Sequence, residues 1–296
     1  MSINNIKKRG RGRPRKDSEA ILVRVPAELL DVIDTHIRES AGSIGRPEAM
    51  RQLISLGFKQ KPPPYWSDDG LSRFFEWAYR SRWATHHRLK KEFKLLASID
   101  QCFVDLFNAS EWLNPKELVE VGLLARASGS FKSACENATA GQVAEAYPQL
   151  RTCLENAAYS IHMQQHPGHD ILWSNRSKDR NKSKNAFLAV DVKKSVANAS
   201  AKLGKAYNHL YQRTIDYGAH PNEAALYGSM KMLKPKAGGR RMEIGQLQGH
   251  GVGMDFALKT AAEVGVCALK IFETIFPERF NTTGVSERLS RWTAEK

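Results

Sequence analysis

The sequence predicts a mainly α-helical protein in two parts: a small N-terminal unit of one strand and two helices, and a larger helical bundle with a small β-hairpin. Three observations support this prediction. Apolar residues recur at spacings of three and four through most of the chain, as in amphipathic helices. A short alternating apolar segment near the N-terminus is typical of a strand. Three consecutive prolines at 62–64 separate the two parts.

The composition favours an anionic partner and a reducing compartment. The chain has 296 residues, with 45 Lys and Arg against 31 Asp and Glu, and this net charge of +14 attracts polyanions. No apolar run approaches the roughly eighteen residues of a membrane span, and the basic N-terminus lacks the hydrophobic segment of a secretory signal. We therefore expect a cytoplasmic, nucleoid-associated protein without membrane contact. Because no Cys-x-x-Cys pair occurs, we expect buried free thiols at Cys102, Cys135, Cys153 and Cys267.

Residues 20–58 predict a strand followed by two helices. In the strand, Ile21, Val23 and Val25 share one face, whereas Leu22 and Arg24 share the other. Apolar residues then recur at helical spacing on both sides of a glycine break. They are Leu29, Leu30, Ile33 and Ile37 in the first helix, and Ala49, Met50, Leu53, Ile54 and Leu56 in the second, with Gly42 and Gly45 between them and Pro47 in a first turn that tolerates proline.

A segment this short rarely buries enough apolar surface to fold alone, so we expect it to pair with a second copy. A lone strand has no neighbour in its own chain. Antiparallel pairing of two copies gives each strand a partner and leaves Leu22 and Arg24 on the outer face. A two-stranded ribbon fits the major groove of DNA, where arginine hydrogen-bonds to guanine.

This unit resembles the ribbon-helix-helix family of DNA-binding repressors. The resemblance is carried by Val-Arg-Val-Pro at 23–26 with the Ala-Glu-Leu-Leu that follows, and by 45–51. It implies a homodimer or higher homo-oligomer on double-stranded DNA, with Leu22 and Arg24 contacting bases. The family grips a backbone phosphate at the start of the second helix, which corresponds here to Gly45 and Arg46, with Arg51 on the same helix. Pro47 removes one amide from this position, where the family more often has serine or another polar residue.

Residues 1–19 predict a basic arm that is disordered on its own. Seven Lys and Arg precede the first acid, Asp17, and such a block repels itself and seeks phosphate. Within it, Arg-Gly-Arg-Pro-Arg-Lys at 11–16 resembles an AT-hook. The resemblance implies that Arg11, Arg13 and Arg15 enter a narrow A·T minor groove, whose negative potential attracts arginine. The alternative is a nonspecific basic tail.

Residues 59–69 form a Pro-rich linker, and residues 70–296 predict a helical domain of unknown function. We expect one long helix over 71–108 and others over 115–134, 142–165, 186–217 as one helix or a pair, and 252–276. The basic stretch 173–184 predicts a loop or the foot of a helix. A hairpin is expected from 225–232 and 242–247.

Three histidines, His162, His166 and His169, are a candidate metal site. Their spacings of four and three would place two of them on one helical face, where they can share a metal ion. Pro167 and Gly168 interrupt the helix before the third. We favour the alternative of exposed histidines at a helix end, and therefore expect no metal and no cofactor.

Arg213, Tyr217 and His220 are a candidate catalytic group. An arginine followed, after six intervening residues, by a histidine resembles the signature of HEPN-type helical ribonucleases. In that family the two side chains handle the ribose hydroxyl and the phosphate, and the site forms between two protomers. The alternative is structural: His220 and Pro221 close a turn, and Arg213 makes a surface pair.

Two further segments have compositions that occur in phosphate-binding or nucleic-acid-binding sites. Residues 245–253 are glycine-rich but lack the Gly-Lys-Ser/Thr of a P-loop, so we expect a flexible turn. Residues 77–94 mix aromatic and basic side chains. We interpret them as a core stripe with a solvated basic face, with nucleic-acid contact as the alternative.

The favoured hypothesis is a non-enzymatic, sequence-specific DNA-binding transcriptional regulator that acts as a dimer, with a helical C-terminal effector or oligomerisation domain. The alternative is a HEPN-like, RNA-directed ribonuclease of the defence type, in which RNA is the partner and the N-terminal segment only dimerises.

Overall fold

The computed structural model describes residues 23–40, 44–59, 69–109, 117–221, 223–233 and 241–294. The chain divides into two compact units, Met1–Ser67 and Asp68–Lys296. The division falls within the expected linker, and each unit is described by itself. Across the described residues the protein is mainly helical, as the sequence predicted. None of the described helices is long and apolar enough to cross a membrane.

The N-terminal unit contains two helices, α1 (Ala27–Glu39) and α2 (Arg46–Lys59). The carbonyl of Pro26 accepts hydrogen bonds from Leu29 and Leu30, both at 3.1 Å, and so starts α1. Gly45 starts α2 in the same way. Both predicted helices are confirmed. Val23–Pro26 has no regular secondary structure in the single chain, and Ile21 and Leu22 lie outside the described residues, so the paired strand stays a prediction.

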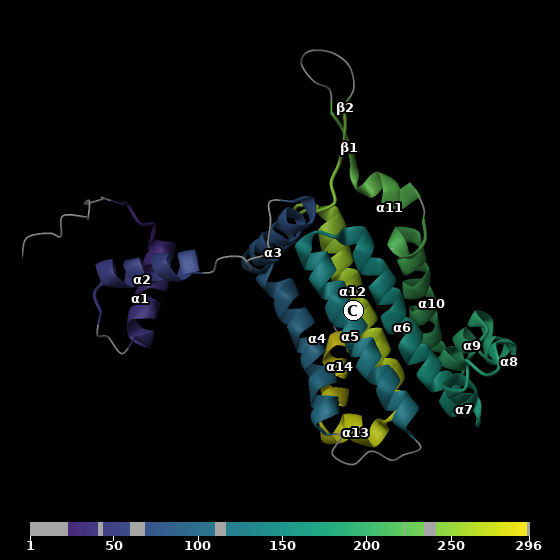
Figure 1. The fold of residues 1–296 in the computed structure, drawn as a ribbon. Helices are drawn as coiled ribbons and strands as arrows, with labels where there is room; N and C mark the ends of the chain where they lie inside the picture. The colour runs from purple at the N-terminus through teal and green to yellow at the C-terminus, as the bar shows by residue number, and fades with distance from the viewer. Residues whose placement is uncertain are drawn as a thin grey trace, which may run out of the picture. The chain divides into compact units, whose positions relative to one another are not determined.

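Three long helices form the centre of the second unit: α5 (Leu118–Ala140), α6 (Val143–Gln165) and α12 (Val252–Ile275). Two others lie beside them, α3 (Gly70–Arg88) and α4 (Lys90–Asn108) (Figure 1). The core between them is closely packed and largely aromatic and aliphatic. Its largest fully buried side chains include Phe103, Phe131, Leu150, Phe272 and Phe280.

Shorter elements surround this centre. They are α7 (His169–Ser174), α8 (Arg180–Ala186), α9 (Ala189–Ala199), α10 (Ala201–Thr214), the π-helical turn η2 (Ile215–Ala219), α11 (Glu223–Gly228), α13 (Pro277–Thr282) and α14 (Val285–Ala294). Strands β1 (Met230–Leu233) and β2 (Arg241–Ile244) pair antiparallel, with Met230 opposite Ile244. Residues 234–240, which join the strands, lie outside the described part.

Several predicted boundaries were wrong. The single helix expected over 71–108 is two helices that meet at Leu89, where ψ is 52°. Buried Thr85 donates a hydrogen bond to the carbonyl of Thr139 at 2.8 Å and holds the last turn of α3 against α5. No glycine or proline marks this break. The stretch 225–228, expected in a strand, belongs to α11. The stretch 173–184, expected as a loop or helix foot, includes most of α8.

Other boundaries follow from visible signals. The helix expected to end near residue 134 continues to Ala140, and its expected start at 114–115 lies outside the described residues. Ser200 divides 186–217 into a helix pair, because its hydroxyl accepts from the Leu203 N–H at 3.3 Å and caps α10. The helices expected over 142–165 and 252–276 are confirmed.

The cysteines are free thiols, as expected. Three of them are buried in the bundle, whereas Cys135 is only half-buried, which corrects the expectation for that residue. Burial raises the pKa of Cys102 to about 11 and that of Cys267 to about 12. These thiols are therefore protonated and unreactive near neutral pH.

Gly141 ends α5 in the left-handed conformation, with φ of 89°. Its carbonyl accepts a hydrogen bond from the N–H of Gln248 at 2.8 Å. A Cβ atom at this position would lie 2.2 Å from the Gln248 carbonyl oxygen. Glycine therefore permits both the sharp α5–α6 turn and the docking of the segment that precedes α12.

Replacing Gly141→Ala should lower the free energy of unfolding by about 2 kcal/mol or more, because it adds both a strained φ and a clash with backbone. Gly129→Ala is the matched control. Gly129 is exposed in the interior of α5, with nothing within 4 Å of an added Cβ, so the change should stabilise by roughly 0.5–1 kcal/mol. Chemical denaturation measures both. Equal stability of the two variants would contradict this account of the turn.

Candidate functional site

The predicted DNA-contacting residues are only partly visible. Arg24 is exposed in the segment before α1, while Arg11, Arg13, Arg15 and Leu22 lie outside the described residues.

Arg46 donates two hydrogen bonds to the carboxylate of Asp34, at 2.9 and 2.8 Å. These bonds lower the pKa of Asp34. Arg51 forms an ion pair with Glu48 of the same helix. Both arginines expected at phosphate therefore have an acidic partner within their own unit, and their side chains are still more than half exposed. Gly45 is exposed at the start of α2, as expected for a backbone contact.

The N-terminal unit leaves much of its apolar surface in water. Within its described residues, the buried hydrophobic side chains are Ile33 and Ala49. Four others are more than half exposed, namely Val23 (58%), Leu29 (55%), Val32 (53%) and Ile54 (54%). Helix α1 thus packs one side on α2 and presents a second apolar side to solvent. Such a surface is typical of a protein–protein interface.

A second exposed surface follows α3 into α4. We name it the aromatic face: Phe75, Tyr79, Trp83, His86 and Phe93. The centroids of Tyr79 and Trp83 lie 6.3 Å apart, and those of His86 and Phe93 lie 4.6 Å apart. The prediction of a core stripe here was wrong, since Tyr79 and Trp83 are about half exposed. Instead α3 contacts the bundle through small side chains, Ala78 and Thr85.

Arg213 and His220 form hydrogen bonds with residues of two different helices. Arg213 forms an ion pair with Glu263 of α12 and also donates to Thr260 at 3.3 Å. The side chains of this pair are only 14% and 17% exposed. His220 accepts from Arg151 of α6 at 2.7 Å. The surface pair suggested for Arg213 is therefore a largely buried one.

Arg151 organises a polar cluster around His220. Its Nε donates to Glu155 at 2.8 Å, and the hydroxyl of Tyr211 donates to the same carboxylate oxygen at 3.1 Å. Lys193 of α9 lies 4.4 Å from the centre of the Tyr211 ring. The basic neighbour of His220 is thus Arg151, which no sequence pattern links to it, because the two are 69 residues apart.

Glycine and proline together hold η2 in place. Pro148 inside α6 has no N–H, so the carbonyl of Ala144 loses its helical donor. Gly218 lies against that carbonyl: a Cβ there would be 2.2 Å from the oxygen. This close approach sets Tyr217 beside Tyr147, with ring centroids 5.6 Å apart.

The three candidate metal ligands meet, contrary to the interpretation that we favoured from sequence. His162 lies in α6, His166 is the C-cap of that helix, and His169 begins α7. Gly168, with φ of 88°, turns the chain so that the third ring returns to the first. One ligand nitrogen from each ring lies within 4.8 Å of the others. Within the described residues, this is the single group of at least three His, Cys, Asp or Glu side chains with such spacing.

Hydrogen bonds orient these rings. Nδ1 of His162 lies 2.7 Å from the hydroxyl of Ser195, and Nε2 lies 2.8 Å from the carbonyl of Ala186. Nδ1 of His166 donates to the carbonyl of His162 at 2.8 Å. His162 is 1% exposed, and burial is the main reason that its pKa is lowered. Burial and the neighbouring His166 also lower the pKa of His169. Both rings are therefore neutral near pH 7.

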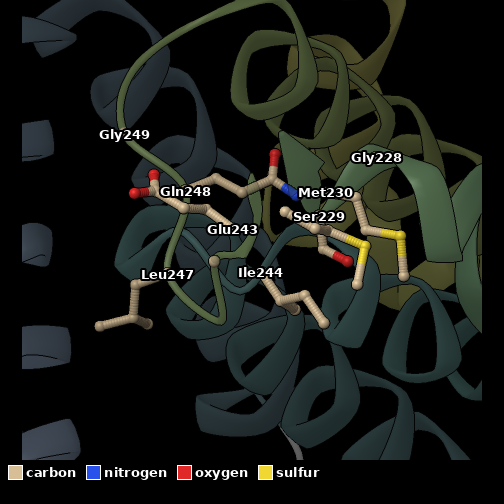
Figure 2. Close-up of a pocket in the computed structure, with 10 residues that line it drawn as sticks. Gly228, Ser229, Met230, Glu243, Ile244, Leu247, Gln248 and Gly249 are labelled. Carbon is tan, nitrogen blue, oxygen red and sulfur yellow. The ribbon is translucent and has the colours of Figure 1, made fainter. Parts of the chain in front are cut away.

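An open concavity of about 700 Å³ lies beside the two strands. Figure 2 shows Met230, Ile244, Leu247 and Gln248 around it. Among the described residues that line it, Glu243 is the one ionisable side chain, so this described lining does not offer the convergent polar groups of a catalytic site. The glycine-rich turn leads into α12. Asp255 in the first turn of that helix pairs with His250 at 3.1 Å. The carboxylate of Asp255 disfavours anion binding at this helix start.

No protein-family model, curated protein or solved structure matches this chain. Its function is therefore inferred from the geometry of its own residues.

Replacing Arg213→Ala should lower the free energy of unfolding by about 3 kcal/mol, because it removes the cation that neutralises the largely buried carboxylate of Glu263. His220→Ala removes a more exposed side chain and should cost less than about 1 kcal/mol. Thermal and chemical denaturation of the two variants measure the difference. If Arg213→Ala were as stable as the parent chain and lost RNA cleavage that the parent possessed, the structural role of Arg213 would be wrong.

Proposed function

We propose that this protein is a sequence-specific, DNA-binding transcriptional regulator that acts as a homodimer through its N-terminal unit. The observation that carries the proposal is the apolar surface of the α1–α2 unit: Val23, Leu29, Val32 and Ile54 are more than half exposed, against a buried pair of Ile33 and Ala49. A second copy would cover this surface with the same apolar side chains and remove both sets from water. The same pairing gives the segment before α1 a strand partner.

Arg24 supports DNA as the partner. It lies in the segment that would form the ribbon, and its side chain is exposed. Two copies present two such arginines to the major groove, where arginine reads guanine. Arg46 and Arg51 lie at the start of α2 beside acidic partners, so we assign the phosphate contact to the backbone there, starting at Gly45, with the two arginines at its edge.

The charge distribution supports the same partner. The basic residues at 7–16 precede any acid, and the whole chain carries +14. In this proposal Arg11, Arg13 and Arg15 follow the minor groove beside the ribbon and supply affinity that depends on salt. The C-terminal unit then serves as an oligomerisation or effector unit. The protein would work at the nucleoid.

Arg24→Ala should weaken binding to the preferred sequence by roughly 1–3 kcal/mol and relax the preference at one base position. Arg38→Ala is the control, because Arg38 is an exposed arginine of α1 that donates to Thr35 and is not among the proposed base contacts. Fluorescence anisotropy with the selected and scrambled duplexes measures both variants. An equal loss on both duplexes would rule out direct readout by Arg24.

Val32→Asp should convert the full-length dimer to a monomer, because it places a charge in the proposed interface. Val190→Asp is a matched control, since Val190 of α9 is 56% exposed and Val32 is 53% exposed. Analytical ultracentrifugation at micromolar concentration distinguishes the two. A dimeric Val32→Asp chain, or a monomeric parent chain, would exclude this interface.

A further inference from the structure

The end of α6 and the start of α7 bring three imidazoles together at the side of the bundle where α7, α8 and α9 lie (Figure 1). The ring centroids of His162, His166 and His169 are 4.3, 5.0 and 5.1 Å apart. Three imidazole rings held this closely by two elements offer three nitrogen ligands to one ion. We propose that His162, His166 and His169 bind one divalent transition-metal ion of the zinc class.

The distances support coordination. Nδ1 of His169 lies 3.3 Å from Nε2 of His162. Two nitrogens bound to one tetrahedral zinc ion, each at about 2.1 Å, are roughly 3.4 Å apart. The third nitrogen lies within 4.8 Å of both, so a small rotation of the His166 ring completes the set. Because His166 is partly exposed, its ring has room for this rotation.

The hydrogen bond of His166 is that of a metal-binding histidine. Its Nδ1–H donates to a backbone carbonyl, which leaves the lone pair of the neutral ring on Nε2. Ser195 donates to the carbonyl of Asp191 at 3.2 Å, so its oxygen can accept Nδ1–H of His162. In that tautomer, which differs from the metal-free one, the lone pair of His162 would be on Nε2, the nitrogen that lies 3.3 Å from Nδ1 of His169.

Binding therefore changes the tautomer of His162, with no net release of a proton from the ring. Without metal, Nε2–H of His162 donates to the carbonyl of Ala186 at 2.8 Å, and the hydroxyl of Ser195 donates to Nδ1. With metal, the proton would move from Nε2 to Nδ1 by exchange with solvent, and the lone pair of Nε2 would bind the ion in place of the Ala186 carbonyl. The hydroxyl of Ser195 would then donate to the carbonyl of Asp191 and accept from Nδ1–H. Ser195 is in this sense a positioning residue for His162.

The ligand chemistry selects the class of ion. The three ligands are imidazole nitrogens, which suit zinc, cobalt, nickel and copper, whereas magnesium and calcium require oxygen ligands. Three protein ligands leave a coordination position for water, which is reached from the exposed side of His166. The proposal is independent of DNA binding by the N-terminal unit, since the three histidines all belong to the second unit.

Isothermal titration of the metal-free, untagged full-length chain with Zn²⁺ at pH 7.5 tests the proposal. We expect one ion per chain with a micromolar or tighter Kd. His166→Ala and His169→Ala should each weaken binding more than about 100-fold, and Ser195→Ala should weaken it by about 10–100-fold. The two partly exposed histidines are chosen because His162 is buried and its loss would disturb the fold.

The double variant His86→Ala, His87→Ala is the matched control. These neighbouring histidines of α3 have ring centroids 5.9 Å apart and lie outside the cluster. Their loss should leave the Kd unchanged, and Co²⁺ bound to the parent chain should show the intense absorption of tetrahedral coordination. Absence of zinc binding tighter than about 100 μM, an equal loss in the control, or an octahedral Co²⁺ spectrum would each overturn the proposal.

Discussion

Hydrophobic burial is the constraint that the proposed function depends on. The α1–α2 unit has few side chains with which to make a core, and its described residues bury Ile33 and Ala49 while leaving Leu29 and Val32 in water. Full burial of a large apolar side chain stabilises by about 1.5–3 kcal/mol, so one left about half exposed forgoes roughly half of this. In the proposed dimer, a second copy would recover this free energy and at the same time pair two copies of the segment that carries Arg24. In the proposal, folding of this unit is therefore coupled to dimerisation, and dimerisation places Arg24 for DNA contact.

The C-terminal unit meets the same constraint within a single chain. Helices α5, α6 and α12 bury apolar side chains against one another. Glycines then allow the surrounding segments to approach the backbone of these helices closely. Gly141 lets the segment before α12 dock on the α5–α6 turn, and Gly218 lets η2 lie on the carbonyl that Pro148 leaves open. The polar clusters around Arg151 and around His162 are positioned by this packing. They join helices that are distant in sequence.

Much of the helical architecture could be predicted from sequence, because it depends on local signals. The apolar run that ends at Pro277 predicted α12, and the helical spacing before and after Gly45 predicted α1 and α2. The break at Leu89 could not be predicted, since it depends on a hydrogen bond between Thr85 and a residue of another helix. The exposure of Trp83 could not be predicted either. Periodicity identifies an aromatic stripe on a helix but does not say which side of the helix faces the bundle.

For the candidate sites too, local spacing could be read from the sequence, whereas the contacts made by tertiary packing could not. Spacing identified the three histidines, but their convergence depends on the left-handed turn at Gly168 and on Ser195 from α9. Spacing also linked Arg213 to His220, whereas packing pairs the first with Glu263 and the second with Arg151.

The central claim is that two chains together read one DNA sequence, and an in vitro selection with the full-length protein tests it most directly. The account predicts enrichment of an inverted-repeat sequence from a random duplex pool, with an even number of chains bound per selected duplex by native mass spectrometry. A pool that stays random after repeated rounds, or a single chain bound to each selected duplex, would contradict it.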